Sequence, residues 1–228
     1  MARLIGGLFG KISGNIGDFT IRNINGKAIV ASRPKHIKVS MEPHCVEIRE
    51  KFAVTTAFSK VVAGLSALNE IWNLNKVLNA TVRNTIFKFN FNLSAAQAPS
   101  INNIITPYGF HSPVNDVSIT AEKLTGSLAS FNSIITIKPD DTGLSINAVV
   151  CSSGPKAEGD SFYDIISLSK EVAGFDFSKQ YDFEIDLSPE QSVLVAKYNQ
   201  KIIYFAVAIK SSENKVTRFS RSFSKIAE

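Results

Sequence analysis

Long apolar runs are missing from this sequence of 228 residues. The longest, Ile202 to Ile209, has eight residues, whereas a helix that crosses a bilayer needs about 20. Near the N-terminus the apolar stretch Leu4 to Phe9 is short and rich in glycine, unlike the core of a secretion signal, which takes about 7–15 residues. We therefore expect no membrane partner, no secretion signal, and a place in the cytoplasm or in a virion.

Cysteine and histidine are also scarce. Cys45 and Cys151 lie about a hundred positions apart and form no CxxC pair, so we expect two small buried side chains, with a disulfide or a reactive thiol as alternatives. The three histidines, His36, His44 and His111, fit no zinc-binding spacing such as HExxH. The sequence therefore predicts no metal site.

Motifs for nucleotide binding and for hydrolysis are absent as well. Neither GxxxxGKS/T nor GxGxxG occurs, and there is no GxSxG. Asp140 and Asp141 are neighbours, and acids alternate at Asp182, Glu184 and Asp186. Alternation is typical of a solvated strand face rather than of two carboxylates that face each other across a cleft. We expect no cofactor and no enzymatic activity.

Positive charge is concentrated at the two ends of the chain, which has a net charge of +5. Residues 1–40 hold seven Lys and Arg against Asp18 alone, a net +6, whereas residues 41–209 are net −4 and residues 210–228 are net +3. This layout suits contact with an acidic partner or with a neighbouring copy of the same chain. Ordinary solvated strand faces are the alternative interpretation.

Residues 1–40 predict a glycine-rich basic arm that leads into a β-hairpin. Apolar residues alternate within Asp18–Ile24 and Lys27–Arg33, and Asn25-Gly26 stands between the two runs. An Asn-Gly pair suits a tight hairpin turn because both residues tolerate positive φ. Five glycines between Gly6 and Gly17 precede the hairpin and disfavour regular helix.

Residues 41–80 predict a helical segment. Ser40-Met41-Glu42-Pro43 is typical of a helix start, with a serine, an acid and a proline close together. Apolar residues then recur at spacings of three and four, which indicates an amphipathic helix of about 22 residues; the stripe is Ile48, Phe52, Thr55, Phe58, Val62 and Leu65. A second helix is expected from Ser66 to about Leu78, with Leu68, Ile71, Trp72 and Leu74 facing inward.

Residues 81–115 are rich in asparagine and proline and predict an extended connector that packs on the rest of the chain. From residue 116 to residue 228 the apolar period becomes two, with turn residues every 8–12 positions or so. The predicted strands are Val117–Thr125, Ile134–Lys138, Leu144–Cys151, Phe162–Leu168, Tyr181–Leu187, Ile202–Lys210 and Val216–Phe223. We therefore predict an α+β fold, mainly β, in which a hairpin and a helical pair precede an immunoglobulin-like β-sandwich.

Several short motifs occur in an order that resembles a large Bacteroidetes family of unknown function. They are Gly10-Lys11, Gly14-Asn15, Gly26-Lys27, Ala31-Ser32-Arg33-Pro34, Glu47-x-Arg49-x-Lys51-Phe52, Val117–Thr120, Leu124–Leu128, Asp160–Ser167, Ile203–Ala208 and Ser220-Arg221-Ser222. One departure is Glu42-Pro43-His44-Cys45, where family members carry glutamine-rich residues. The resemblance implies a basic N-terminal hairpin, a helix and a C-terminal sandwich, and it carries no activity. The opening also resembles that of phage structural proteins.

Together these observations predict a non-catalytic structural protein of a phage or phage-like particle that assembles with itself or with a larger complex. The expected contact residues lie in the basic hairpin: Arg22, Lys27, Arg33, Lys35 and Lys38. A module that binds nucleic acid without sequence preference is one alternative, since such residues can lie along a phosphate backbone. A ligand-binding sandwich is another, with an aromatic patch of Phe162, Tyr163, Tyr181 and Tyr198.

Overall fold

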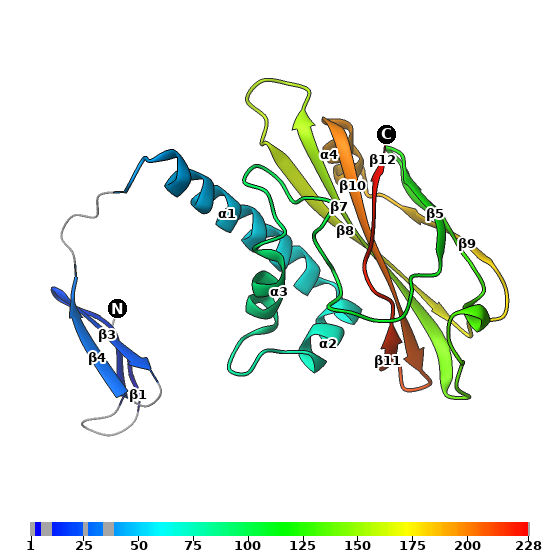
Figure 1. Cartoon of the computed structure of the whole chain (residues 1–228), viewed down its shortest axis with the longest axis horizontal. Helices are drawn as coiled ribbons and strands as arrows, with labels where there is room; N and C mark the ends of the chain where they lie inside the picture. Colours follow the sequence, from blue (N-terminus) through cyan, green and yellow to red (C-terminus); the bar gives the residue numbers. More distant parts are fainter. Residues whose placement is uncertain (1–2, 6–10, 25–26, 34–38, 228) are drawn as a thin grey trace. The chain divides into compact units, whose positions relative to one another are not determined.

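The computed structural model describes residues 3–5, 11–24, 27–33 and 39–227 (Figure 1). Its contacts divide the chain into two compact units, Met1–Glu42 and Pro43–Glu228, close to the boundary that the sequence predicts after residue 40. The helical segment, the connector and the sheets that follow all belong to the second unit. Strands outnumber helices, so the chain is α+β and mainly β, as predicted.

The N-terminal unit is a four-stranded antiparallel sheet in the order β1-β2-β3-β4, with β1 Arg3–Ile5, β2 Lys11–Ile16, β3 Phe19–Ile24 and β4 Lys27–Ser32. Strands β3 and β4 match the predicted hairpin, whose turn residues Asn25 and Gly26 lie outside the described residues. Strand β2 replaces part of the expected arm, because Gly17 starts a second tight turn with a φ of +55°, which places Ile16 opposite Phe19.

Three helices open the larger unit: α1 Pro43–Gly64, α2 Ser66–Leu74 and α3 Val82–Asn90. Helix α1 has the predicted length, but only the second half of its stripe is buried, whereas Ile48 and Phe52 are exposed. Helix α2 ends four residues before the predicted boundary, which leaves Leu74 exposed. No single helix in this part of the chain is long and apolar enough to cross a membrane; α1 and α2 pass that test only together, across a bend of 104°.

Helix α3 corrects the expectation of an extended connector. The Thr81 side chain accepts a hydrogen bond from the backbone N–H of Asn84 and caps the helix. At the other end, the buried Asn90 side chain accepts from the N–H of Ile104 at 2.8 Å and donates to its carbonyl at 3.0 Å. An asparagine that is typical of a loop in the sequence therefore holds the connector against a helix through two hydrogen bonds.

Two antiparallel sheets follow. The smaller has the order β5-β6-β9, and the larger has the order β11-β10-β7-β8 with β12 also paired to β10. Their strands are β5 Val114–Ile119, β6 Lys123–Leu128, β7 Asp141–Pro155, β8 Tyr163–Ala173, β9 Tyr181–Asp186, β10 Tyr198–Ser211, β11 Val216–Phe219 and β12 Phe223–Ala227. Most predicted strands are present at nearly the predicted positions.

Three predicted strands differ from the structure, and one helix was not predicted. The range 117–125 holds a turn between β5 and β6, and 216–223 is divided between β11 and β12. Residues 134–138 form no strand, because the 3-10 helix η1, Phe131–Ser133, turns the chain just before them. Helix α4, Pro189–Ala196, was not predicted, although Ser188 and Gln191 form a capping box around its start.

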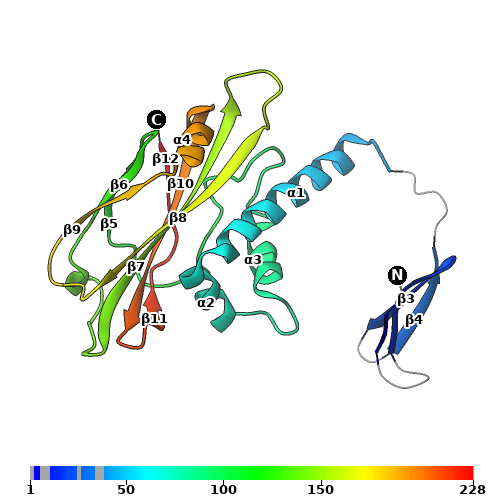
Figure 2. The same ribbon diagram turned by 180° about the vertical axis from the view of Figure 1, so that it is seen from behind.

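The larger sheet is buried on both faces (Figures 1 and 2). On β10, Ile203, Phe205 and Val207 pack toward the small sheet, whereas the alternating Tyr204, Ala206 and Ala208 pack toward helices α1, α2 and α3. Strand residues point alternately to the two faces, so a strand covered on both sides must be apolar throughout. This explains the run from Ile202 to Ile209.

The two edges of the larger sheet differ. Along β11 and β12 the connector covers the edge: the N–H of Phe110 donates to the carbonyl of Phe219 at 3.1 Å, and the N–H of Arg221 donates to the carbonyl of Phe110 at 2.8 Å. At the opposite edge, β8 pairs with β7 on its inner side. No other strand of the described chain pairs with β8.

The loop between η1 and β7 is anchored by a buried carboxylate. Asp141 accepts hydrogen bonds from the N–H of Lys138 at 2.8 Å and the hydroxyl of Thr217 at 2.9 Å, and it forms an ion pair with Arg218. Burial alone would raise the pKa of Asp141, but these donors and the Arg218 charge outweigh it and lower the pKa below its ordinary value of 3.8. The folded state therefore favours the ionised carboxylate.

Gly126 makes room for the central aromatic contact between the sheets. A Cβ at this position would lie 2.6 Å from Cζ of Phe183, which stacks on Phe205 with ring centroids 5.4 Å apart. We expect Gly126→Ala to lower the free energy of unfolding by about 1–3 kcal/mol through overpacking, measured by urea denaturation. Gly143→Ala is the matched control, since its nearest neighbour lies at 3.5 Å; equal losses in both variants would contradict this account.

Asp141 should make stability depend on acid pH. Its folded pKa is lowered, so its contribution is complete above its unfolded pKa of 3.8 and is lost as the pH falls through the folded value. We expect Asp141→Asn to lower the free energy of unfolding by about 3 kcal/mol at pH 7, because Arg218 loses its partner. The difference from the native protein should narrow below about pH 4, and a constant difference from pH 7 to pH 2.5 or so would disprove the assignment.

Candidate interaction surfaces

One face of the N-terminal sheet carries exposed apolar side chains. The strand register places Ile16 opposite Phe19 and Ile21 opposite Val30, and directly opposed residues lie on the same face of a sheet. The exposed fractions are 46% for Ile16, 53% for Phe19 and 60% for Val30. These side chains form the surface that we call the apolar face; Ser32, opposite Phe19, lies at its margin.

The other face of this sheet is mixed and carries positive charge. Arg22 lies opposite Ile29, and Thr20 lies opposite Ala31. Arg22 is exposed, and Ile29 has an exposed fraction of 47%. The sheet is therefore amphipathic across its thickness, with an arginine on one side and mainly apolar groups on the other.

Two of the five predicted contact residues have described side chains. Arg22 on β3 and Arg33 just after β4 are exposed, and the N–H of Arg33 donates to the carbonyl of Asp18 at 2.6 Å. Lys27 begins β4, but its side chain lies outside the described part, as do Lys35 and Lys38 altogether. The predicted contact residues are all charged, and none of them belongs to the apolar face. The pairing of Phe19 with Ile16 and of Ile21 with Val30 indicates that face once β2 is known.

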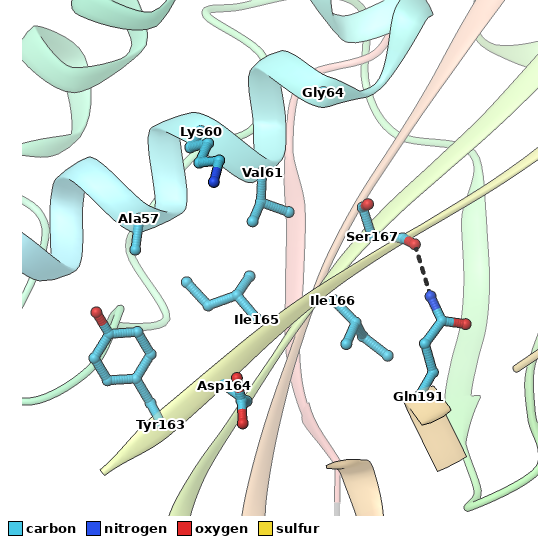
Figure 3. A pocket seen from close by; sticks show the side chains of 10 residues that line it. All are labelled: Ala57, Lys60, Val61, Gly64, Tyr163, Asp164, Ile165, Ile166, Ser167 and Gln191. Atoms are coloured by element: carbon cyan, nitrogen blue, oxygen red, sulfur yellow. Dashed lines mark hydrogen bonds between the residues drawn. The ribbon is translucent and has the colours of Figure 1, made fainter. Parts of the chain in front are cut away.

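A groove runs along the open edge of β8 in the larger unit (Figure 3). Its volume is about 540 Å³. Ala57 and Val61 of α1 point toward Ile165 of β8, while Asp164 and Ile166 lie on the other side of the strand. The groove therefore follows the edge of the strand and meets side chains from both faces of the sheet.

Polar groups at this groove belong to three elements. The Gln191 side chain of α4 donates to the carbonyl of Ser167 at 3.4 Å, and Lys60 of α1 lies at the opposite wall. The carboxylate of Asp164 accepts from the hydroxyl of Tyr198 at 3.1 Å. Burial and this hydrogen bond raise the pKa of Tyr198 to about 12, so the phenol stays neutral and acts as a donor.

The four aromatic residues of the predicted ligand patch do not gather in one place. Tyr163 lies at the groove, opposite Ser153 of β7. Tyr181 instead packs against Phe175, whose N–H donates to the carbonyl of Thr142 near the start of β7. About ten strand residues, or roughly 33 Å, separate these two ends of β7. Phe162 is exposed and Tyr198 is buried.

The chemistry-bearing residues form no catalytic constellation among the described side chains. His44 and His111 are exposed, and Asp182, Glu184 and Asp186 occupy the solvated face of β9. Burial raises the pKa of the Cys151 thiol to about 12, which makes it a poor nucleophile. Cys45 is only partly buried, so the expectation of a buried cysteine holds for Cys151 alone.

No metal centre is assembled in the described part of the chain. It contains no group of three or more His, Cys, Asp or Glu side chains placed to hold a metal ion.

Comparison with known proteins adds little to this geometry. Neither a family model nor a curated protein matches the sequence. Two solved structures have partly similar backbones, and both are of a beta-glucosidase from Kluyveromyces marxianus, one of them in complex with glucose. They are 11% and 9% identical to this chain, with TM-scores of 0.23 and 0.21. The matches cover 63% of this chain and 17% of the beta-glucosidase chains, and at such TM-scores they carry no argument about fold or activity.

Proposed function

We propose that this chain is a non-catalytic structural protein that assembles with copies of itself through its N-terminal sheet, as a component of a phage or phage-like particle. The observation that carries the proposal is the apolar face, where Ile16, Phe19 and Val30 are all about half exposed or more. Contiguous apolar side chains on a surface mark sites of association.

The size of the N-terminal unit supports a partner at this face. A unit of 42 residues has too little interior to be stable by hydrophobic burial alone, and domains of about this size usually need disulfides, metals or association. A second copy of the same sheet supplies a face of the same size and composition. Two such sheets would pack about 10 Å apart, with the arginine-bearing faces outward.

This contact is small. Four strands of up to six residues present a flat area of roughly 400 Å² on each copy. The total of about 800 Å² lies below the roughly 1,200 Å² at which the range of specific, stable protein interfaces begins. We therefore expect association to be weak and concentration-dependent unless a second surface contributes.

We further propose that the two sheets of the larger unit form an immunoglobulin-like sandwich. The strand order supports this: naming β5, β6 and β9 as A, B and E, and β11 with β12, β10, β7 and β8 as G, F, C and C′, gives sheets A-B-E and G-F-C-C′. Immunoglobulin domains have the same neighbours, with C′ here in place of D. Such sandwiches serve many functions, and this one supplies edges and loops for contacts.

Nucleic-acid binding is the second candidate. It is favoured by the exposed Arg22 and Arg33 and by the net positive charge of residues 1–40. Contact with phosphates would depend steeply on salt, because each contact releases counterions. The resemblance to a Bacteroidetes family, which carries no activity, does not distinguish between the two candidates.

Val30→Ser should weaken self-association. Loss of an apolar side chain from the contact costs about 1.5 kcal/mol per copy, so we expect the dissociation constant to rise at least about tenfold. Analytical ultracentrifugation over a range of concentrations measures this. Ile29→Ser is the matched control, since Ile29 is the neighbouring residue with similar exposure on the opposite face. A native protein that is monomeric at every concentration, or equal effects of the two variants, would refute the proposal.

A salt-titrated mobility shift with random-sequence DNA tests the second candidate. Binding that weakens steeply with salt, and that Arg22→Ala with Arg33→Ala abolishes, would support nucleic-acid contact, because these side chains are exposed and would contact phosphates. Binding that the double variant leaves unchanged would rule out this surface. Lys156→Ala is the control. It also removes a positive charge, but from the larger unit, where the Lys156 ammonium group donates to the carbonyl of Ala196.

A further inference from the structure

The outer edge of β8 is a long strand edge with little protection. The strand has 11 residues, and in the described chain β7 is its only strand partner. Natural proteins usually shorten, charge or cover such edges, because unpaired N–H and C=O groups are a template for another strand. Here the groove along the edge leaves it accessible between α1 and α4.

The orientation of Ser167 shows which backbone groups face outward. Its carbonyl accepts from Gln191. On β10 the carbonyl of Val207 accepts from Ser220 on the β11 side. The registers of β10 with β7 and of β7 with β8 therefore turn the backbone groups of the even-numbered β8 residues toward β7 and those of Ser167 away from it. In an antiparallel ladder the N–H and C=O of one residue point to the same side, and residues two apart repeat this orientation. Ile165, Ser167 and Ser169 therefore present their backbone groups to the groove.

We propose that β8 pairs antiparallel with β8 of a second copy, with the two-fold axis at Ser167. In this register Ser167 lies opposite Ser167 of the second copy, and Ile165 lies opposite Ser169. The residues that would exchange backbone hydrogen bonds are thus the ones whose N–H and C=O groups point to the groove. The same register places Asp164 opposite Lys170 of the second copy, and Lys170 opposite its Asp164. Both opposed pairs are of opposite charge, and such pairs stabilise neighbouring strands.

The apolar residues agree with this register as well. Ile166 and Leu168 lie on the same face of β8 as Asp164 and Lys170, because they alternate with the outward-facing residues. The two-fold axis sets Ile166 of one copy opposite Leu168 of the other. The strand is thus self-complementary over seven residues, from Asp164 to Lys170.

Existing contacts of these residues leave room for the pairing. The Gln191 hydrogen bond to Ser167 is long, at 3.4 Å, so a backbone N–H replaces it at little cost. Asp164 and Lys170 are each only partly buried; Lys170 donates to the carbonyl of Glu184 at 3.0 Å and Asp164 accepts from Tyr198. A carboxylate with four acceptor sites and an ammonium with three donors can each take a further partner.

This contact is independent of the N-terminal apolar face, which lies in the other unit of the chain. A protein with two different two-fold contacts does not stop at a dimer, because each copy still offers an unused surface to the next copy. The pairing of β8 would therefore link weak dimers into longer assemblies of many copies.

Ser167→Pro in the full-length chain tests the pairing. Its N–H points away from β7, so proline removes no hydrogen bond of the native ladder and blocks only an added strand. In a Val30→Ser background we expect a dimer by analytical ultracentrifugation, and a monomer once Ser167→Pro is added. A monomer with Val30→Ser alone, or a dimer that survives Ser167→Pro, would overturn the β8 pairing. Failure of the N-terminal contact would instead leave native and Val30→Ser proteins alike.

Charge variants keep the test valid if the proline variant does not fold. In the Val30→Ser background, Lys170→Glu opposes like charges across the axis, and so does Asp164→Lys; each should weaken the dimer at least about a hundredfold. Mixing the two variants restores opposite charges at both positions, so a heterodimer should form that neither variant forms with itself. Absence of that heterodimer, while each variant keeps the native circular dichroism, would overturn the register.

Discussion

Burial of the larger sheet on both of its faces is the constraint on which the rest of the larger unit depends. Strands β7 and β10 contribute alternate residues to two separate clusters, one shared with the small sheet and one with the helices. Neither the small sheet nor the helices can be removed without exposing a row of large apolar side chains on the larger sheet. The polar character of the connector follows from this arrangement, because the connector packs against the covered sheet and must satisfy its own backbone groups. Asn90 accepts from the N–H of Ile104, and Ser222 accepts from the N–H groups of Ile105 and Thr106.

The N-terminal unit obeys the same physics with the opposite result. Apolar residues gather on one face of its sheet, whereas the other face is mixed. On the apolar face, Ile16, Phe19 and Val30 remain about half exposed or more. A sheet that is amphipathic and too small to fold back on itself gains stability only from a partner. In the larger unit the burial of apolar side chains is completed within the chain, whereas in the smaller unit the proposed association would complete it.

Much of this fold could be predicted from the sequence, and the failures have identifiable causes. The turn signal at Asn25-Gly26 and the apolar stripe from Ile48 to Leu65 are local patterns, and they predicted the positions of β3, β4 and the 22-residue helix α1 well. Helix α3 was missed because asparagine-rich segments usually form loops. The hydrogen bonds between the Asn90 side chain and the backbone of Ile104 cannot be predicted from composition. The exposure of Arg22 could be expected from its charge, and its role in a contact stays a prediction. The apolar face, in contrast, emerges only when the register of β2, β3 and β4 is known.

The two proposed contacts differ in their physics, and that difference matters for assembly. The apolar face gains free energy from water exclusion, which added salt does not weaken. The β8 edge relies on backbone hydrogen bonds and on two partly exposed ion pairs, which salt screens over a Debye length of about 8 Å at physiological ionic strength. Rising salt would then weaken the β8 contacts first and leave dimers held together by the N-terminal sheets. With such a hierarchy, salt concentration would set how many of the weak N-terminal dimers are joined through β8, without removing the dimer contact itself.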